Sequence, residues 1–558
     1  MQLHNPIGFA TGDFIELGLA AFLVLLAILW GPYISPFLDW FGARKFRCMM
    51  ALAILPVGLR LALLPHHPVP TPDIYDEFGH LLVADTLRHF RLANPPHALP
   101  QFFETFFVLQ RPTYSSIYPI GQGLALAFGW MIFGLPWAGV LASCAALCAL
   151  CYWMLRGWTS PRWALLGGLL CVFEFGPLNA WTNDYWGGSL AAAGGCLVFG
   201  ALPRLREKYR VRDAVWLGLG MGINLLVRPY ESVFLVLSVI LFWLPDWRRA
   251  WQRPALIAAL VVLPAIGITL LQNERVTGSW MTLPYSVSQY QYGVPASLTF
   301  QANATPHNIL TREQDLEYKS QRAFRASEVE TAGSYFRRLI FRIRYYRFFF
   351  YAPLYLALIA FVPAIRSYRY LWVVSTVALF ALGTNFFPAF QFHYMAAVVC
   401  LFVLMSVAGL EWLSRWDAGA KAANLILWLC LAQFVFAYAT GAVQERIPSR
   451  RIAVDRQVAQ IPGKLLVFVR YWPNHIFQDE WVYNGADIDG SRVVWARDLG
   501  EPEDEKLRKY YPGRAVWLLE PDAMPPALTP YKPEPALPPA EPPKKEKTPP
   551  PLRFENIP

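Results

Sequence analysis

The sequence predicts a mostly α-helical, polytopic membrane protein with about 12 transmembrane helices, a re-entrant or juxtamembrane helix, and a small C-terminal α/β extracytoplasmic domain. Apolar residues make up 55% of the 558 residues and charged residues only 16%. So little charge cannot cover the surface of a water-soluble globule of this size. The formal charge of +10 lies in short spacers between long apolar runs, whereas a nucleic-acid-binding protein would gather it on one polar domain.

Twelve apolar runs are candidates to cross a hydrocarbon core about 30 Å thick. They lie at 14–31, 48–64, 137–155, 162–178, 188–203, 213–227, 232–245, 254–272, 347–365, 370–384, 394–413 and 422–441. No basic stretch precedes the first run and no small-residue cleavage site follows it. We therefore expect an integral helix there, and not a cleaved signal.

A further apolar run, 118–133, begins with Tyr118-Pro119 and contains three glycines. Basic residues in short loops mark the cytoplasmic side of a membrane protein. Six basic clusters fall on one side only if 118–133 does not cross completely, which predicts a re-entrant or surface-lying helix. The clusters contain Arg44, Lys45, Arg47; Arg156, Arg162; Arg204, Arg206, Lys208, Arg210, Arg212; Arg248, Arg249, Arg253; Arg366, Arg369; and Arg415, Lys421. The same reasoning places 65–117, 178–188, 273–346 and the chain after about 442 outside.

The C-terminal part changes character. Residues 465–470, 492–496 and 515–520 are typical of short strands, and 501–510 has helical composition. From about Ala523 the chain is rich in proline with interspersed Lys and Glu, which predicts an extended tail. We therefore divide the chain into an additional N-terminal span and loop (1–47), a membrane domain (48–442), a small α/β domain (443–522) and a Pro-rich tail (523–558).

All eight cysteines lie in or beside apolar runs, so the external segments have no disulfide framework. Cys144, Cys148 and Cys151 share one helical face, but their neighbours are Ala, Leu and Val. We expect small residues packing between helices there, and not a metal site.

Three carboxylates, Asp73, Asp76 and Glu77, directly follow the second span, at the water edge of the bilayer. They adjoin a helix-like segment at 81–90, and the aromatic residues Tyr75 and Phe78 lie among them. A carboxylate at this position can act as a general base on an acceptor hydroxyl, and nearby arginines can bind a phosphate. The alternative is a solvated loop without a chemical role.

This segment resembles the first external loop of the glycosyltransferase C (GT-C) superfamily, and most closely its protein mannosyltransferase and aminoarabinose transferase branch. The resemblance covers about 48–440, but its specific motif is confined to 73–123. The matching residues are Asp76, Glu77, His80, Ala84, Pro95-Pro96 and Tyr118-Pro119. The resemblance implies an inverting enzyme that takes a sugar from a polyprenyl-phosphate carrier at the outer face of the membrane. It also implies that Asp76, with Glu77 beside it, is the catalytic carboxylate.

The charged residue that several family members have before the proline is replaced here by Ser116-Ile117. This departure leaves metal use open, with Mg or Mn as the candidate divalent cation and Asp76 and Asp184 as the candidate ligands. No other cofactor is expected. The expected partners are a lipid-linked sugar donor, membrane lipids and a glycan, lipid or protein acceptor, and no nucleic acid.

Eight residues are candidates for substrate binding. They are His80, Arg111, Tyr118, Asp184, Arg228, Glu231, His393 and Tyr394. Structural alternatives stay open for several of them. The aromatic residues around Asp184 can form an interfacial belt, Glu231 can be the ion-pair partner of Arg228, and His393 can be a packed core residue.

A multispan transporter or flippase of lipid-linked sugars is the main alternative, but it would carry its charges inside spans and show related halves. A polysaccharide polymerase or ligase outside the superfamily, or a non-catalytic scaffold, are further alternatives. We expect the protein in a bacterial-type inner membrane, with the active site and the C-terminal domain outside.

Overall fold

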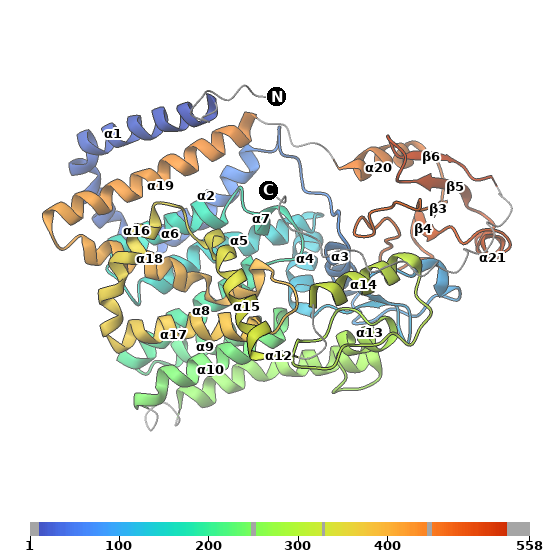
Figure 1. Ribbon diagram of the computed structural model, residues 1–558, viewed down its shortest axis with the longest axis horizontal. Helices are drawn as coiled ribbons and strands as arrows, with labels where there is room; N and C mark the ends of the chain where they lie inside the picture. Colours follow the sequence, from blue (N-terminus) through green and yellow to red (C-terminus); the bar gives the residue numbers. More distant parts are fainter. Residues whose placement is uncertain (1–10, 247–252, 326–329, 444–448, 533–558) are drawn as a thin grey trace.

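The computed structural model describes residues 11–246, 253–325, 330–443 and 449–532. Figure 1 shows a large helical body joined at one end to a smaller sheet domain. The helices of the body that correspond to the predicted apolar runs are α1 (Thr11–Gly42), α2 (Lys45–Ala62), α5 (Trp137–Leu155), α6 (Pro161–Phe175), α8 (Ser189–Glu207), α9 (Val211–Val227), α10 (Pro229–Trp243), α12 (Pro254–Thr277), α16 (Leu354–Phe361), α17 (Tyr368–Thr384), α18 (Val399–Leu413) and α19 (Asp417–Val443). Each predicted apolar run overlaps one of these helices.

Within the described ranges, four helical segments are long and apolar enough to cross a membrane. They are α5, α12, α19, and α18 taken together with the short helix η5 (Phe392–Val398) that precedes it. The protein is therefore a mostly helical, multipass membrane protein, and the number of twelve spans stays a prediction.

The predicted run 347–365 is not one continuous span. The helical segments Ala332–Phe349 and Leu354–Arg366 meet at a bend of 114°. The cause is local, because Phe350 is extended and Pro353 caps the start of α16, where a proline cannot continue the preceding helix. A second proline, Pro363, opens the short helix η4 (Val362–Arg366).

Helix α4 (Ile120–Phe133) corresponds to the run predicted not to cross. Its 14 residues are apolar apart from Gln122. They rise roughly 21 Å at about 1.5 Å per residue, which is less than a hydrocarbon core of about 30 Å. The helix packs closely on α3 (Tyr75–Arg88), since a side chain at Gly123 would collide with Val83. Its position relative to the membrane stays a prediction.

The core of the helical body is built mainly from apolar side chains of α5, α6, α8 and α18, with further side chains from neighbouring helices. Small residues let the backbones approach, as at Gly195, where an added Cβ would lie 1.8 Å from the carbonyl oxygen of Ala397. All eight cysteines are buried free thiols, so the prediction of no disulfide framework is confirmed.

The external segments contain short elements. The first has the short helix η1 (Pro100–Phe103) and a two-stranded hairpin of β1 (Val108–Leu109) and β2 (Ser115–Ser116). The second has the helices α13 (Pro284–Tyr292), α14 (Arg312–Arg325), α15 (Ala332–Ile343) and η3 (Arg344–Phe349). The remaining short helices are α7 (Ala180–Asn183) and η2 (Leu244–Asp246).

The C-terminal domain has a four-stranded sheet of order β4-β3-β5-β6. Strand β3 (Leu465–Val469) is parallel to β4 (Val493–Arg497) and β5 (Ala515–Glu520), and β6 (Ala527–Pro530) is antiparallel to β5. Helices α20 (Arg450–Gln460) and α21 (Glu503–Tyr510) complete the domain. The prediction of an extended tail from about 523 is wrong for residues 527–530, which form the edge strand β6. Prolines are tolerated in an edge strand. Residues 533–558 of that tail lie outside the described residues.

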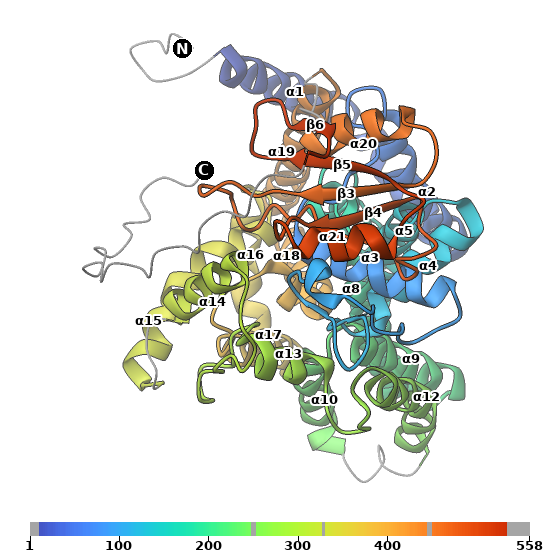
Figure 2. The same cartoon turned by 90° about the vertical axis from the view of Figure 1, so that its right-hand side faces the viewer.

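The C-terminal domain packs directly on α3 (Figure 2). The backbone N–H of Ala486 donates to Asp85 at 2.7 Å, and the rings of Phe78 and Tyr483 lie 4.5 Å apart. The guanidinium of Arg451 lies 4.7 Å from the ring centroid of Phe78. Helix α3 is thus held between the helical body and the sheet domain.

Candidate active site

Helix α3 begins with the acidic residues of the first external segment. Glu77 fixes this beginning, because its carboxylate accepts hydrogen bonds from the backbone N–H groups of Asp73 at 2.9 Å and Ile74 at 3.4 Å. Such a cap satisfies N–H groups that have no partner inside the helix. Helix α3 therefore starts at Tyr75, six residues before the predicted helical segment, and places Asp76 in its first turn.

Asp76 is half-buried, and its carboxylate accepts a hydrogen bond from the hydroxyl of Tyr118. Burial raises the pKa of Asp76 to about 6. The Tyr118 hydroxyl and the positive charge of Arg228 oppose this rise, while the negative charge of Glu317 adds to it. A carboxylate with a pKa just below neutrality is suited to take a proton from an acceptor at physiological pH.

Glu77 has a different environment from Asp76. Its carboxylate also accepts from the backbone N–H of Tyr185 at 3.1 Å, so its hydrogen bonds all come from the main chain. Burial raises its pKa to about 7, against the effect of these hydrogen bonds. Glu77 ties α3 to the segment 178–188, and this geometry fits a positioning residue better than the catalytic role that we expected.

His80 lies one turn after Asp76 and is buried. Its ring stacks on the ring of Tyr118, with centroids 4.2 Å apart and an angle of 29° between the planes. Burial, and secondarily the charge of Arg228, lower the pKa of His80 to about 3, so the ring is neutral. His80 therefore orients Tyr118, which in turn donates to Asp76.

Gly79 provides the space for Tyr118. A Cβ at this position would lie 2.8 Å from two ring carbons of Tyr118, closer than packed side chains tolerate. We predict that Gly79→Ala displaces the ring and lowers kcat by about 10- to 100-fold, because a small misplacement of a reacting group is costly. Gly58→Ala is the control, since a Cβ at Gly58 meets nothing within 4 Å. Equal kcat values for the two variants in the purified protein would contradict the role given to Tyr118.

Arg228 lies at the joint between α9 and α10, across from α3. Its charge acts on Asp76, His80 and His393, so these groups share one region. Its guanidinium lies 5.7 Å from the ring centroid of Tyr394. Among the described residues, no carboxylate lies within ion-pair distance of Arg228, although Glu231 follows one turn later. Glu231 is buried, with one carboxylate oxygen that has no hydrogen-bond partner in the described part of the chain.

His393 and Tyr394 lie on η5, on the same side as Arg228. The ring of His393 meets Trp186 edge-on at 5.6 Å, and the ring of Tyr394 stacks on Phe387 at 4.3 Å. His393 is 9% exposed, so it is packed among these rings.

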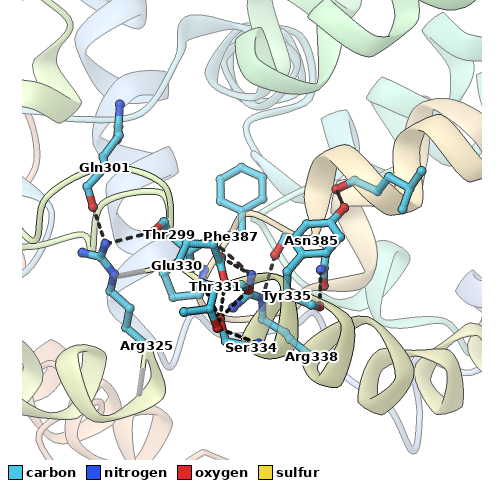
Figure 3. Close-up of polar contacts among 12 residues, drawn as sticks. Thr299, Gln301, Arg325, Glu330, Thr331, Ser334, Tyr335, Arg338, Asn385 and Phe387 are labelled. Atoms are coloured by element: carbon cyan, nitrogen blue, oxygen red, sulfur yellow. Dashed lines mark hydrogen bonds and ion pairs between the residues drawn. The ribbon is translucent and has the colours of Figure 1, made fainter. Parts of the chain in front are cut away.

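A polar network supports the loop that carries Phe387 (Figure 3). Arg338 of α15 donates to the carbonyl oxygen of Asn385 at 2.7 Å and to Glu330, and Asn385 donates to the carbonyl oxygen of Tyr335 at 2.9 Å. In the same close-up, Arg325 donates to the carbonyl oxygens of Thr299 and Gln301. The second external segment thereby holds in place the loop whose Phe387 stacks on Tyr394.

Three residues of the cluster were missed in the sequence. Tyr75 donates to Glu317 of α14 at 3.0 Å, and burial raises the pKa of Glu317. Tyr285 of α13 lies close enough for the charges of Asp76 and Glu231 to act on it. Glu317 and Tyr285 come from the second external segment, where many similar aromatic and acidic residues gave no signal to rank one above another, and Tyr75 lies in the first external segment, where only its position among the carboxylates was noted.

Two predicted binding residues lie elsewhere. Arg111 is exposed, and its backbone carbonyl oxygen accepts a hydrogen bond from Gln291 at 2.9 Å. Asp184 lies beside Glu77, and burial followed by the charge of Glu77 raises its pKa well above the usual range. One oxygen of Asp184 has no hydrogen-bond partner among the residues that the structure describes.

The residues proposed as metal ligands do not form one site. Asp76 interacts with Tyr118, Glu317 and Arg228, whereas Asp184 interacts with Glu77. Over the described ranges, no three His, Cys, Asp or Glu side chains gather in a way that could hold a metal ion. Metal use stays a prediction, and no step of the reaction is derived through a metal.

Comparisons with known proteins give matches in structure alone. No family model and no curated protein sequence matches the chain. The crystal structure of ArnT from Cupriavidus metallidurans in the apo state is 12% identical with a TM-score of 0.49, over 84% of this chain and 92% of that one. The same protein bound to undecaprenyl phosphate gives 11% identity and a TM-score of 0.47, over the same shares of the two chains.

The archaeal oligosaccharyltransferase AglB from Archaeoglobus fulgidus, in complex with an inhibitory peptide and a dolichol-phosphate, is 12% identical with a TM-score of 0.39. This match covers 86% of this chain and 70% of that chain. ArnT and AglB are glycosyltransferases of the GT-C superfamily, the superfamily that the first-loop motif of this chain also resembles.

Proposed function

We propose that the protein is an inverting glycosyltransferase that moves a sugar from a polyprenyl-phosphate carrier to an acceptor at the outer face of the membrane. The observation that carries this proposal is the pairing of Asp76 with Tyr118 within reach of the charge of Arg228. One cluster thus contains a carboxylate that is suited to act as a base, Asp76, and a cation, Arg228. Among the described residues, Arg228 has no ion-pair partner. These are the two groups that transfer from a sugar phosphate requires.

The proposed donor has a charged phosphate and an apolar tail. Arg228 lies at the end of two apolar helices, so its guanidinium can bind the phosphate while the lipid chain lies against helix surfaces. Polyprenyl and dolichyl phosphates are the lipids bound in the ArnT and AglB structures, and we propose the same class of carrier here.

The proposed reaction is a single displacement. The acceptor hydroxyl attacks the anomeric carbon of the sugar from the face opposite the phosphate, and its proton passes to the carboxylate of Asp76. The bond between the anomeric carbon and the phosphate oxygen breaks, and the carrier phosphate leaves with the electron pair. Arg228 stabilises the negative charge that grows on this phosphate, and one displacement inverts the configuration.

The transporter alternative is not favoured by this geometry. A transporter would carry its functional charges inside spans, near the middle of the membrane. Here Asp76 and Glu77 lie in the first turn of α3, a helix that is not among the candidate spans.

The pKa of Asp76 predicts the pH dependence of transfer. The base must be deprotonated, so kcat/KM should rise with pH up to about 6 and level off above it. Tyr118→Phe removes a hydrogen bond that stabilises the charged carboxylate, so the pKa should rise and the rising limb should move to higher pH.

Tyr114→Phe is the matched control for this profile. It removes a buried hydroxyl from the same external segment, one that donates to the carbonyl oxygen of Asn484 at 2.9 Å and not to Asp76. The rising limb of its profile of kcat/KM against pH should coincide with that of the wild-type protein. A Tyr118→Phe profile that coincides as well would contradict the assignment of the limb to Asp76.

A further inference from the structure

A basic cavity lies at the opposite end of α9 from Arg228. It has a volume of about 230 Å³ and lies between the ends of α5 and α8 and the start of α9. Its lining residues are Arg156, Gly157, Arg204, Glu207, Lys208, Arg210, Arg212 and Asp213. Five cations against two carboxylates leave a formal charge of +3 in this lining. A water molecule takes about 30 Å³, so the cavity is large enough for a group much larger than water.

Two of these arginines are fixed in the wall. Arg204 donates to the carbonyl oxygen of Trp153 at 2.7 Å, and its guanidinium lies 4.2 Å from the ring centroid of the same tryptophan. Arg156 donates to the hydroxyl of Tyr152 at 3.1 Å and to the carbonyl oxygen of Gly42 at 3.3 Å. These guanidinium groups are held at the cavity by the protein and are not free to turn away from each other.

The cations repel one another at this place. The charges of Arg156, Arg204 and Arg212 all act on Lys45, which begins α2 nearby. Asp213 offsets part of this repulsion, but its carboxylate lies 3.7 Å from Arg212, and only one other acid, Glu207, lines the cavity. Basic loops are explained by membrane orientation, but orientation does not require five cations to converge on one cavity. An anion in the cavity would relieve the repulsion.

We infer that this cavity binds a phosphate group, either the headgroup of an anionic phospholipid or a free phosphate anion. Arginine forms paired hydrogen bonds with phosphate oxygens. Basic pockets between helices at the cytoplasmic side suit such headgroups. The 17 residues of α9 span roughly 25 Å at about 1.5 Å per residue, so this site is separate from the cluster around Asp76.

The test uses the full-length protein and a double variant, Arg210→Gln with Arg212→Gln. Both side chains are exposed at the rim, so their loss should not disturb the core. The control is Arg366→Gln with Arg415→Gln, which removes the same charge from the same predicted side, at exposed residues outside the cavity. Retention of phosphatidylglycerol and phosphatidylcholine is measured by native mass spectrometry, and Tm is measured with and without inorganic phosphate.

For the wild type and the control we expect preferential retention of phosphatidylglycerol, a rise of Tm with inorganic phosphate, or both. The cavity variant should lose this retention or stabilisation by roughly tenfold or more, because two charge-assisted contacts are removed. Lipid retention without a phosphate effect identifies a headgroup, and a rise of Tm with phosphate alone identifies a soluble anion. Equal losses in the two variants, or no preference for either anion in the wild type, would overturn the inference.

Discussion

Asp76→Asn is expected to reduce kcat for sugar transfer by about 10²- to 10⁴-fold, which is the usual contribution of a general base. Asparagine keeps the size of the side chain and can still contact the hydroxyl of Tyr118, but it cannot take the proton of the acceptor. The measurement is turnover of a polyprenyl-phosphate sugar by the purified protein. The donor KM should change little, because the donor phosphate is assigned to Arg228.

Asp73→Asn is the matched control. Asp73 is an exposed acid three residues earlier, whose carboxylate accepts from the hydroxyl of Ser449 at 2.6 Å. This variant makes the same chemical change in the same segment and should keep kcat within about threefold of wild type. If Asp76→Asn also stays within this range, Asp76 is not the base.

Arg228→Gln is expected to raise the donor KM by about 10- to 100-fold and to lower kcat as well. Hydrogen bonds to charged groups contribute about 1.5–3 kcal/mol, and the growing charge on the leaving phosphate strengthens them in the transition state. Among the described residues no carboxylate lies within ion-pair distance of Arg228, but its charge acts on Asp76 and Glu231. Its replacement should therefore also raise the pKa of Asp76, which adds to the fall in kcat. Initial rates at varied donor concentration give both parameters.

Arg275→Gln provides the comparison for Arg228. Arg275 lies near the end of α12 and its side chain is 64% exposed, so it reports the effect of losing one external positive charge. Its donor KM should stay close to the wild-type value. An equal rise of KM in the two variants would indicate general electrostatic attraction, and not a phosphate contact at Arg228.

The local parts of the fold were predictable from the sequence. The apolar runs coincide with helices, and β3, β4 and β5 lie within a residue or two of the predicted strands, because both patterns depend on neighbouring residues. Strand β6 was not predictable, since its partner β5 stabilises it despite a proline-rich composition. The bend at Pro353 was missed because the apolar run continues on both sides of it.

The candidate site was predictable in part. Asp76, Tyr118 and Arg228 were identified, and the structure brings them together although they are far apart in the chain. Glu77 looks like Asp76 in sequence, and only its three backbone contacts distinguish a capping carboxylate from a free one. The contact of Tyr75 with Glu317 joins residues 242 positions apart, and no local pattern contains such information.

The central claim is that this chain consumes a lipid-linked sugar by means of Asp76. The most direct test is the content of polyprenyl-phosphate sugars in cells that lack the gene, measured by mass spectrometry of lipid extracts. We predict that one such lipid accumulates, that wild-type and Asp73→Asn proteins restore its normal level, and that Asp76→Asn expressed equally does not. No accumulation on deletion, or full restoration by Asp76→Asn, would contradict the account.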